Sequence, residues 1–443
     1  MSFHHDGGGC PALADRGTRV THRGCQLYVR CGSSGRGLAA MRAPTRVHMI
    51  GVLSLTSMPP WDEHFPGGRA LTLDDLERDF HGSLAAVRST EPVSWVPALG
   101  GWLITGRDLV VSVLRDPIRF TVDDPRFSTQ LVIGPSMLSL DGSEHGRHRA
   151  PFEQSFRRGD PALLRERMTA TATRLIHAFA DDRRAELRAQ LAAPLAATVM
   201  VDALGLVDVD VNALLSWYGA IVRDVARTSL GERPSEASEE AMTLLRSAVE
   251  RSVGESELLS QARSCLSLNE VVSNVAVLLF GGVETSEAMT ANAFAHLLSN
   301  SDVHAALLAD PSLTSAFVEE SIRCEPAAAQ LDRYATVDVA LGDAAIKAGD
   351  FVVCSIAGAN RDPSVFEEPD RFDVSRSNAK ANISFALGPH ACLATHVAKA
   401  QTEAAVRCLF GILRSVRLDR SVGEPSVEGI VFRKVSSVPV VWE

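Results

Sequence analysis

Apolar residues recur at helical spacing over long stretches of the chain, which favours a mainly α-helical fold. The helical periodicity runs through residues 162–204, 237–253, 268–299 and 313–324. Shorter runs, rich in β-branched and aromatic residues, predict strands at 93–95, 102–105, 337–341 and 351–356. From Trp61 onward no linker rich in Pro, Gly or Ser interrupts the pattern. We therefore expect one large domain, mainly α-helical with small β-sheets.

The beginning of the chain has a different composition. Residues 1–46 contain seven Arg and only two acidic residues, Asp6 and Asp15, and they are rich in Gly. No helical or alternating apolar period runs through them, which favours disorder or an extended arm. We interpret residues 1–58 as an N-terminal extension, disordered or preceding the true start, and residues 59–443 as the domain.

Charge and cysteine usage exclude several classes of protein. The 54 acidic residues outnumber the 44 basic ones, giving a net charge of −10, which argues against nucleic acid as the main partner. No run approaches the ~20 consecutive apolar residues that cross a bilayer. The 8 Cys form no Cys-x-x-Cys pair, and a chain of 443 residues needs no disulfide scaffold. We expect a soluble, cytoplasmic protein with free thiols and no membrane span.

Chemistry is concentrated in the segment from Ser384 to Ala394. A loop containing Gly388 leads into a predicted amphipathic helix, and Cys392 is placed at the beginning of that helix. Unpaired N–H groups and the positive helix end would favour a thiolate there. Gly388 would let the backbone pass close to a flat ligand, and Phe385 could pack beside the sulfur. Cys392 could be a buried structural thiol, a zinc ligand together with His390 and His396, or the axial ligand of a haem.

The pattern Phe385-x-x-Gly388-x-His390-x-Cys392-x-Ala394 resembles the haem-binding signature of the cytochrome P-450 monooxygenases. Ala386 and Ala394 stand where Gly is more usual in that family. The resemblance covers about Trp61 to Glu443. It implies a cytochrome P-450-type fold of the soluble bacterial kind, haem b (iron protoporphyrin IX) as the cofactor and Cys392 as the ligand of its iron.

A second match lies in the predicted helix 268–299, which begins with Ser267 and Glu270 at capping-box spacing. Gly281 and Gly282 fall in its middle, where each glycine costs about 1 kcal/mol relative to Ala. They would allow a local widening and the approach of a ligand, or the close crossing of another helix. Glu284 and Thr285 follow directly. The resemblance implies that this acid and this alcohol relay protons to dioxygen.

Two further matches have structural or cofactor-binding roles in the family. Glu320 and Arg323 are spaced to meet on one helix face, and the resemblance adds Arg371 of a later loop as the third member of a structural lock. On their own, Glu320 and Arg323 could equally be a solvated surface pair.

Cationic donors are natural partners for the two propionates of a haem. The resemblance assigns this role to His145, Arg149, Arg333 and His390, although these residues could also form an ordinary solvated face. It also places residues 120–138, 216–233, 277–282 and 327–331 at the distal pocket.

The reaction implied by the resemblance uses one O2, two electrons and two protons, inserts one oxygen atom into a hydrophobic small molecule and releases water. Electrons would come from a separate donor of the ferredoxin or flavodoxin type, for which Arg147, Arg149, Arg157 and Arg158 are candidate contacts. Two alternatives are a peroxide-driven haem-thiolate enzyme, which would not need Glu284 and Thr285, and a non-catalytic haem sensor.

Overall fold

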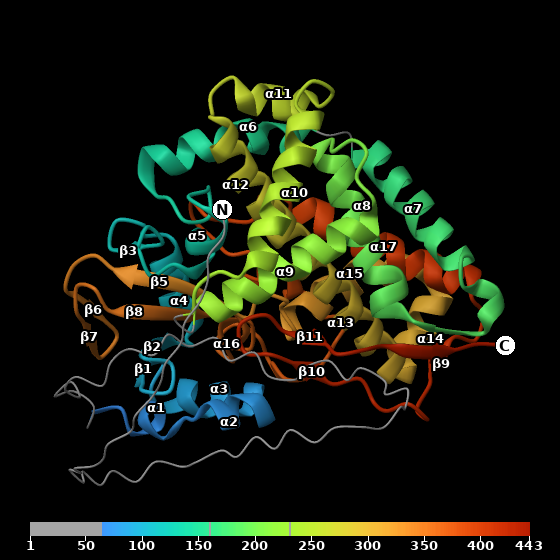
Figure 1. Ribbon diagram of the computed structural model, residues 1–443. Helices are drawn as coiled ribbons and strands as arrows, with labels where there is room; N and C mark the ends of the chain where they lie inside the picture. The colour runs from blue at the N-terminus through green and yellow to red at the C-terminus, as the bar shows by residue number, and fades with distance from the viewer. Residues whose placement is uncertain (1–63, 159–160, 230–231) are drawn as a thin grey trace, which may run out of the picture. The chain divides into compact units, whose positions relative to one another are not determined.

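The computed structural model describes residues 64–158, 161–229 and 232–443 (Figure 1). The extension expected at residues 1–58 lies outside the described residues, as does the beginning of the domain expected at residue 59. Both stay predictions.

Helices make up most of the described chain. They are α1 (Pro66–Ala70), α2 (Leu73–Arg78), α3 (Phe80–Thr90), α4 (Arg107–Leu114), α5 (Ser128–Ile133), α6 (Gly142–Arg158), α7 (Pro161–His177), α8 (Ala193–Leu204), α9 (Val211–Ser229), α10 (Glu236–Ser252), α11 (Glu257–Arg263), α12 (Leu268–Leu279), α13 (Thr285–Ser299), α14 (Ser301–Ala309), α15 (Thr314–Cys324), α16 (Ile356–Asn360) and α17 (Thr395–Ile412). Short 3₁₀ turns lie at Ala180–Asp182, Pro311–Leu313 and Ala379–Ala381, and π-helical turns at Arg188–Ala192 and Phe280–Glu284.

The strands are short and form small sheets, as expected. They are β1 (Val93–Val96), β2 (Gly101–Ile104), β3 (Phe120–Thr121), β4 (Arg184–Glu186), β5 (Gln330–Ala335), β6 (Val339–Leu341), β7 (Ala344–Ile346), β8 (Phe351–Ser355), β9 (Arg417–Leu418), β10 (Val427–Glu428), β11 (Lys434–Val435) and β12 (Pro439–Val441). The largest sheet has the order β1-β2-β8-β5-β3, in which β2 and β8 are parallel and the other pairs antiparallel. Pairing with β8 on one side and β3 on the other fixes the position of β5.

The predicted helix at 268–299 is present as α12, a π-helical turn and α13 in direct succession. The capping box is formed: Glu270 N–H donates to Ser267 Oγ at 3.3 Å, and Ser267 N–H donates to the Glu270 carboxylate at 2.7 Å. All residues from Val271 to Phe280 are buried. A helix that is buried around its whole circumference, here including the polar Ser273 and Asn274, passes through the core instead of along its surface. The predicted widening is the π-helical turn at Phe280–Glu284, where the two glycines lie.

One predicted helix is interrupted. The periodicity at 162–204 predicts continuous helix, but α7 ends at His177 and α8 begins at Ala193. A 3₁₀ turn at Ala180–Asp182 follows α7 and is ended by Arg183, whose backbone is left-handed with φ of 55°. Strand β4 then pairs with β12. Tertiary pairing between distant strands overrides the local periodicity here.

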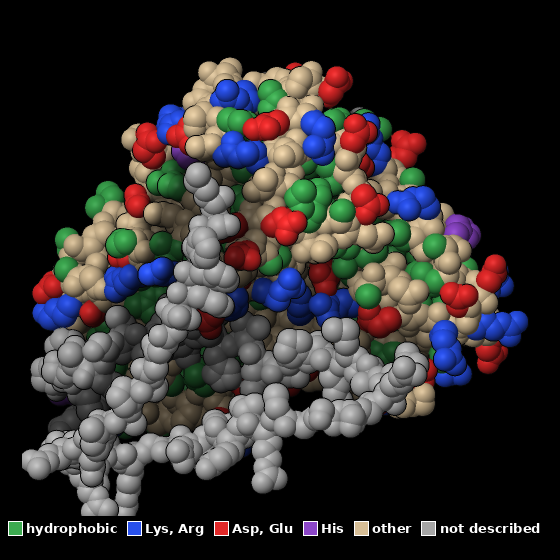
Figure 2. Space-filling model, viewed as in Figure 1, with side chains coloured by type: hydrophobic (Ala, Val, Ile, Leu, Met, Phe, Trp, Pro, Cys, Tyr) green, Lys and Arg blue, Asp and Glu red, His purple; other side chains and the backbone are tan. Residues whose placement is uncertain are grey.

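Charges are distributed without a dominant sign on the face shown in Figure 2. Lys and Arg side chains alternate with Asp and Glu over its described part, around α9, α10 and α11. Among the described residues, no helix is both long and apolar enough to cross a membrane.

Candidate active site

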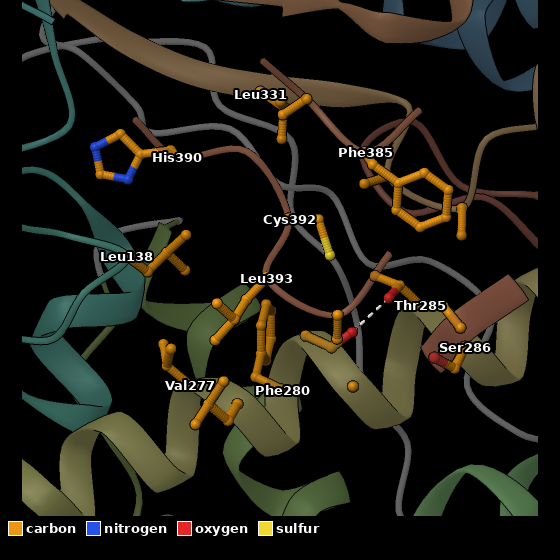
Figure 3. A pocket seen from close by; sticks show the side chains of 18 of the residues that line it. Leu138, Val277, Phe280, Thr285, Ser286, Leu331, Phe385, His390, Cys392 and Leu393 are labelled. Atoms are coloured by element: carbon orange, nitrogen blue, oxygen red, sulfur yellow. Dashed lines mark hydrogen bonds between the residues drawn. The ribbon is translucent and has the colours of Figure 1, made fainter. Parts of the chain in front are cut away.

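The helix formed by α12, the π-helical turn and α13 is called the central helix below. A cavity of about 310 Å³ lies where this helix, the loop before α17 and strand β5 meet. Its lining is largely apolar and comes from segments far apart in sequence: Val122, Met137, Leu138, Val225, Val277, Phe280, Gly281, Gly282, Thr285, Met289, Ala327, Ala328, Leu331, Arg333, Phe385, His390, Cys392 and Leu393 among others. Figure 3 shows the sulfur of Cys392 pointing toward the helix that carries Thr285. The cavity therefore brings together the two sequence motifs that are richest in chemistry.

The loop that carries Cys392 is held by its own backbone. Cys392 N–H donates to the carbonyl of Phe385 at 2.8 Å, and Ala386 and Gly388 have positive φ values of 56° and 75°. A Cβ at Gly388 would lie 2.2 Å from the carbonyl oxygen of Leu114 at the end of α4. The expectation that Gly388 admits a flat ligand is therefore wrong. Gly388 does not line the cavity, and its missing side chain lets the loop pack against α4.

The expected charge state of Cys392 also needs correction. Helix α17 begins at Thr395, so Cys392 precedes the helix and is not its first residue. Cys392 has accessible surface and lines the cavity. Burial raises the pKa of Cys392, against smaller lowering effects from the Ala394 N–H, the Thr395 hydroxyl and the Arg149 guanidinium. Without a ligand the thiol form is favoured, and binding of a metal ion is what would deprotonate it.

Three of the four predicted propionate-binding residues line the cavity: Arg149, Arg333 and His390. Arg333 is 5% exposed, donates only to the carbonyl of Asp332 at 2.7 Å, and has no carboxylate within ion-pair distance among the described residues. Burial lowers its pKa. A buried guanidinium without an anionic partner is costly, and an anionic ligand in the cavity would offset that cost.

The fourth residue, His145, lies behind His390 and does not line the cavity. The two rings are in contact and tilted by 44°, with centroids 4.4 Å apart, and Nε2 of His145 is buried without a hydrogen-bond partner in the described structure. Burial, with the nearby charges of His390 and Arg149, lowers the pKa of His145 to about 4. His390 Nε2 lies 2.8 Å from Asp141. Asp141 is a residue that the sequence analysis missed, because nothing local indicates that it meets a loop 249 positions away.

The central helix presents Gly281, Gly282 and Thr285 to the cavity. A Cβ at Gly281 would meet nothing within 4 Å, so this position keeps space open, whereas a Cβ at Gly282 would lie 2.3 Å from Met200 Sδ of α8. Both sequence interpretations thus apply, one to each glycine. The Thr285 hydroxyl donates to the carbonyl of Gly281. Glu284 does not line the cavity.

The lock around Glu320 is present, but its third member differs from the prediction. Arg323 donates to both carboxylate oxygens of Glu320 at 2.8 Å, and neither side chain is exposed. Arg376 donates to Glu320 at 3.0 Å, whereas Arg371 is 61% exposed and pairs with Glu368 and Asp373. The assignment of Arg371 is therefore wrong. The loop turns after Arg371 and directs Arg376 inward.

Comparison with known proteins agrees with this geometry. A model of the family described as cytochrome P450 matches residues 223–414. The monooxygenase PikC of Streptomyces venezuelae is 30% identical over 397 residues, covering 83% of this chain and 92% of that protein. The mycinamicin IV hydroxylase/epoxidase of Micromonospora griseorubida is 32% identical over 392 residues, covering 82% and 97%. The chain belongs to the cytochrome P450 family.

Solved cytochrome P450 structures share the fold. The structure of CalO2 superimposes with a TM-score of 0.75 at 27% identity, covering 86% of this chain and 98% of that one. P450BioI, solved with an acyl carrier protein that carries hexadec-9Z-enoic acid, gives a TM-score of 0.76 at 22% identity over 83% of this chain. As a cytochrome P450, this protein is a haem-containing monooxygenase, an oxidoreductase that acts on small molecules with O2 and electrons from a redox partner.

The residues present fit a haem. A single cavity holds a free thiol, two guanidinium groups, one imidazole and the open space over Gly281. By contrast, no group of three or more His, Cys, Asp or Glu among the described residues is arranged to hold a metal ion. The zinc interpretation of Cys392 with His390 and His396 therefore lacks a ligand set.

The distal segments expected from sequence contribute to the lining, with Val225 representing residues 216–233. Sequence reasoning missed Phe156, Met200, Gln401, Val431 and Phe432, which also line the cavity. Their only sequence signal is apolar or amide character in segments that look like ordinary core. The sheet and helix packing that brings them here is not visible locally.

Proposed function

We propose that this cytochrome P450 binds haem through Cys392, with Arg149, Arg333 and His390 holding its propionates and His145 supporting His390. When bound, the haem supplies the iron at which O2 is reduced and from which an oxygen atom passes to the substrate. The single observation that carries this proposal is that the Cys392 thiol and the unpaired Arg333 guanidinium open onto the same apolar cavity.

The chain's own residues then have separate tasks. Thr285 offers a hydroxyl at the cavity wall, and its bond to the Gly281 carbonyl holds that hydroxyl in place. Glu284 is the nearest carboxylate along the helix and is the candidate proton source for Thr285. The apolar lining excludes bulk water, so that protons reach the site through these groups instead of from solvent at random.

Spectroscopy of the reduced protein with carbon monoxide tests the Cys392 assignment. We expect a Soret band at the red-shifted position typical of thiolate ligation, and its loss in Cys392→Ser. Cys408→Ser is the matched control, because Cys408 lies on α17 and contacts Thr173 at 3.6 Å, outside the cavity lining. A protein without bound haem, or a Cys392→Ser variant that keeps the band, would overturn the proposal.

The substrate is a hydrophobic or amphipathic small molecule. Small residues, Ala327 and Ala328, and flexible Met289 line the cavity, which supports a bulky apolar ligand. Relatives are named for mycinamicin IV and vitamin D(3) as substrates. Titrating these two compounds into the haem protein and following the shift of the Soret band tests the class. A response only to small polar compounds would contradict it.

The electron donor is an acidic ferredoxin or flavodoxin. Arg115 supports this proposal, since it is exposed at the end of α4 and packs against Gly388 in the Cys392 loop. Of the residues expected from sequence, Arg147 pairs with Glu144 and Glu270, and Arg149 faces the cavity. The side chains of Arg157 and Arg158 lie outside the described residues.

Arg115→Glu should raise the KM for spinach ferredoxin and weaken the salt dependence of reduction. Arg420→Glu, at an exposed position after β9, is the control. Equal KM values for both variants and the unchanged protein would exclude docking at Arg115. A cytoplasmic location is part of the proposal, and it is supported by the five described cysteines, all of which are free.

A further inference from the structure

The carboxylate of Glu284 is turned away from the cavity that its neighbour Thr285 lines. One of its oxygens accepts a hydrogen bond from the Tyr218 hydroxyl of α9 at 2.7 Å. The other lies 2.6 Å from the ammonium of Lys434 in β11. Both carboxylate oxygens are therefore engaged by side chains of other elements, and Glu284 itself does not line the cavity.

Charges around Glu284 are balanced by pairs. Glu287, on the next turn of the same helix, lies 2.6 Å from Arg188 and 3.9 Å from Lys434. The side chains of Lys434 and Arg188 are 26% and 29% exposed, whereas that of Glu284 is only 8% exposed. Water thus reaches the Lys434 and Arg188 cations, whereas the Glu284 carboxylate, the candidate proton source, is shielded from solvent.

The Tyr218 hydroxyl is a permanent donor in this arrangement. Burial, with the charge of Glu284 as a second cause, raises the pKa of Tyr218 well above its ordinary value. The side chain is held among the apolar residues of the core, so its hydroxyl has few alternatives to Glu284. A buried hydrogen bond to a carboxylate restrains the carboxylate more strongly than a solvated one does.

Helix α9 connects this contact to the cavity. Tyr218 and Val225 are seven residues apart, two turns along the helix, and therefore share one face. Val225 lines the cavity and is 3% exposed, so a molecule that fills the cavity contacts the same helix face that holds Glu284.

We propose that Tyr218 and Lys434 are positioning residues that hold the Glu284 carboxylate out of the cavity. The two contacts, Tyr218–Glu284 and Lys434–Glu284, are called the clasp below. Contact of a substrate with Val225 loosens the clasp through α9. The proposal rests on the proposed role of Glu284 as the proton source for Thr285. Without a substrate the clasp keeps protons from the cavity, and with a substrate it releases them.

The effect of the clasp can be measured without a known substrate, from the products of O2 reduction among which the electrons are divided. One electron passed to O2 gives superoxide and needs no proton. Two electrons and two protons give hydrogen peroxide, and four of each give two waters. The ratio of peroxide plus water to superoxide, measured per NADPH consumed, therefore reports proton supply. Spinach ferredoxin and its reductase deliver the electrons to the haem-loaded protein.

Tyr218→Phe and Lys434→Met should each raise this ratio about tenfold, the factor that corresponds to one lost hydrogen bond to a charged group. The solvent deuterium isotope effect on the ratio should fall at the same time. Arg188→Met is the matched control, because Arg188 pairs with Glu287 and not with Glu284. A ratio that stays unchanged in both variants, with Tm and carbon monoxide spectrum intact, would overturn the proposal.

Two further variants separate the parts of the argument. Val225→Phe, with Val225→Leu as the milder change, adds bulk at the cavity face of α9 and should raise the ratio only while Tyr218 is present. If adding Val225→Phe to the Tyr218→Phe variant raised the ratio by the same factor as it does in the unchanged protein, transmission through Tyr218 would be excluded. In a Glu284→Gln background, Tyr218→Phe should have no effect, and a persisting effect would mean that Tyr218 acts elsewhere. Failure of the proposed function itself would show separately, as a missing thiolate band or as full coupling in Thr285→Ala.

Discussion

Arg376 donates a hydrogen bond to Glu320 at 3.0 Å, from a loop 56 residues further along the chain. The same guanidinium also donates to the backbone carbonyls of Glu367, Glu368 and Arg371. The side chain is only 7% exposed. Arg376 therefore closes the loop that precedes the Cys392 segment and ties it to α15, a structural role that requires no contact with the cavity.

Arg376→Ala should lower the free energy of unfolding by about 2 kcal/mol, because the buried Glu320 carboxylate loses one of its two guanidinium partners and the loop loses the donor that joins its carbonyls. Arg371→Ala is the matched control in the same loop and should unfold like the unchanged protein, since its ion pairs are exposed. Urea unfolding curves compare the two. Equal losses in both variants would restore Arg371 to the lock.

Thr285→Ala should lower the fraction of the consumed NADPH that leads to product. The hydroxyl that Thr285 presents to the cavity is lost, so less product forms per NADPH. Proton-transfer groups typically contribute about 10²- to 10⁴-fold to a rate, and we expect coupling to fall at least about tenfold. Thr290→Ala, on the same helix but bonded to Thr402 at 3.0 Å, should keep its coupling. Product per NADPH, with vitamin D(3) or mycinamicin IV as trial substrate, is the measurement. Equal coupling in the two variants would argue against the role of Thr285.

The two central glycines should respond differently to the same substitution. Gly281→Ala places a methyl group in open space, so stability should hold or rise by up to about 1 kcal/mol, while haem binding weakens. Gly282→Ala drives a methyl group into buried Met200 and should cost about 1 to 3 kcal/mol. Thermal unfolding of the haem-free proteins and haem titration separate the two effects. Reversed outcomes would mean that Gly282, not Gly281, keeps space open in the cavity.

Glu325 should support stability at neutral pH and lose that contribution in acid. Burial acts to raise its pKa, but His81 at 2.9 Å and Arg433 at 2.6 Å outweigh burial and hold the pKa at about 2, below the ordinary 4.5. Because the folded-state pKa is the lower one, the contribution is complete above about pH 4.5 and disappears as the pH falls toward 2.

Glu325→Gln should therefore be less stable than the unchanged protein at pH 7, by roughly 3 kcal/mol, and the difference should shrink between pH 4.5 and 2. Glu424→Gln, at an exposed position, is the control. Unfolding by urea across this pH range tests the expectation. A difference that stays constant with pH would mean that Glu325 is not ionised in the folded protein.

Local patterns in the sequence were sufficient for much of this protein. The periodicity predicted α10, α12, α13 and α15 to within a few residues, and the capping box at Ser267 and Glu270 is present, because hydrogen bonds within one turn depend only on neighbours. The Cys392 loop and the glycines at the π-helical turn were also visible, since unusual residues in regular elements carry a cost that something must offset.

Tertiary structure decided how these parts meet. It replaced Arg371 by Arg376, turned Gly388 toward Leu114 instead of the cavity, and directed Glu284 to Tyr218 and Lys434. Each of these contacts joins residues far apart in the chain, and their side-chain directions follow from packing, where one turn of a loop moves a residue from solvent to core. The sequence by itself determined which chemical groups are available, and only the folded core determined which of them face one another.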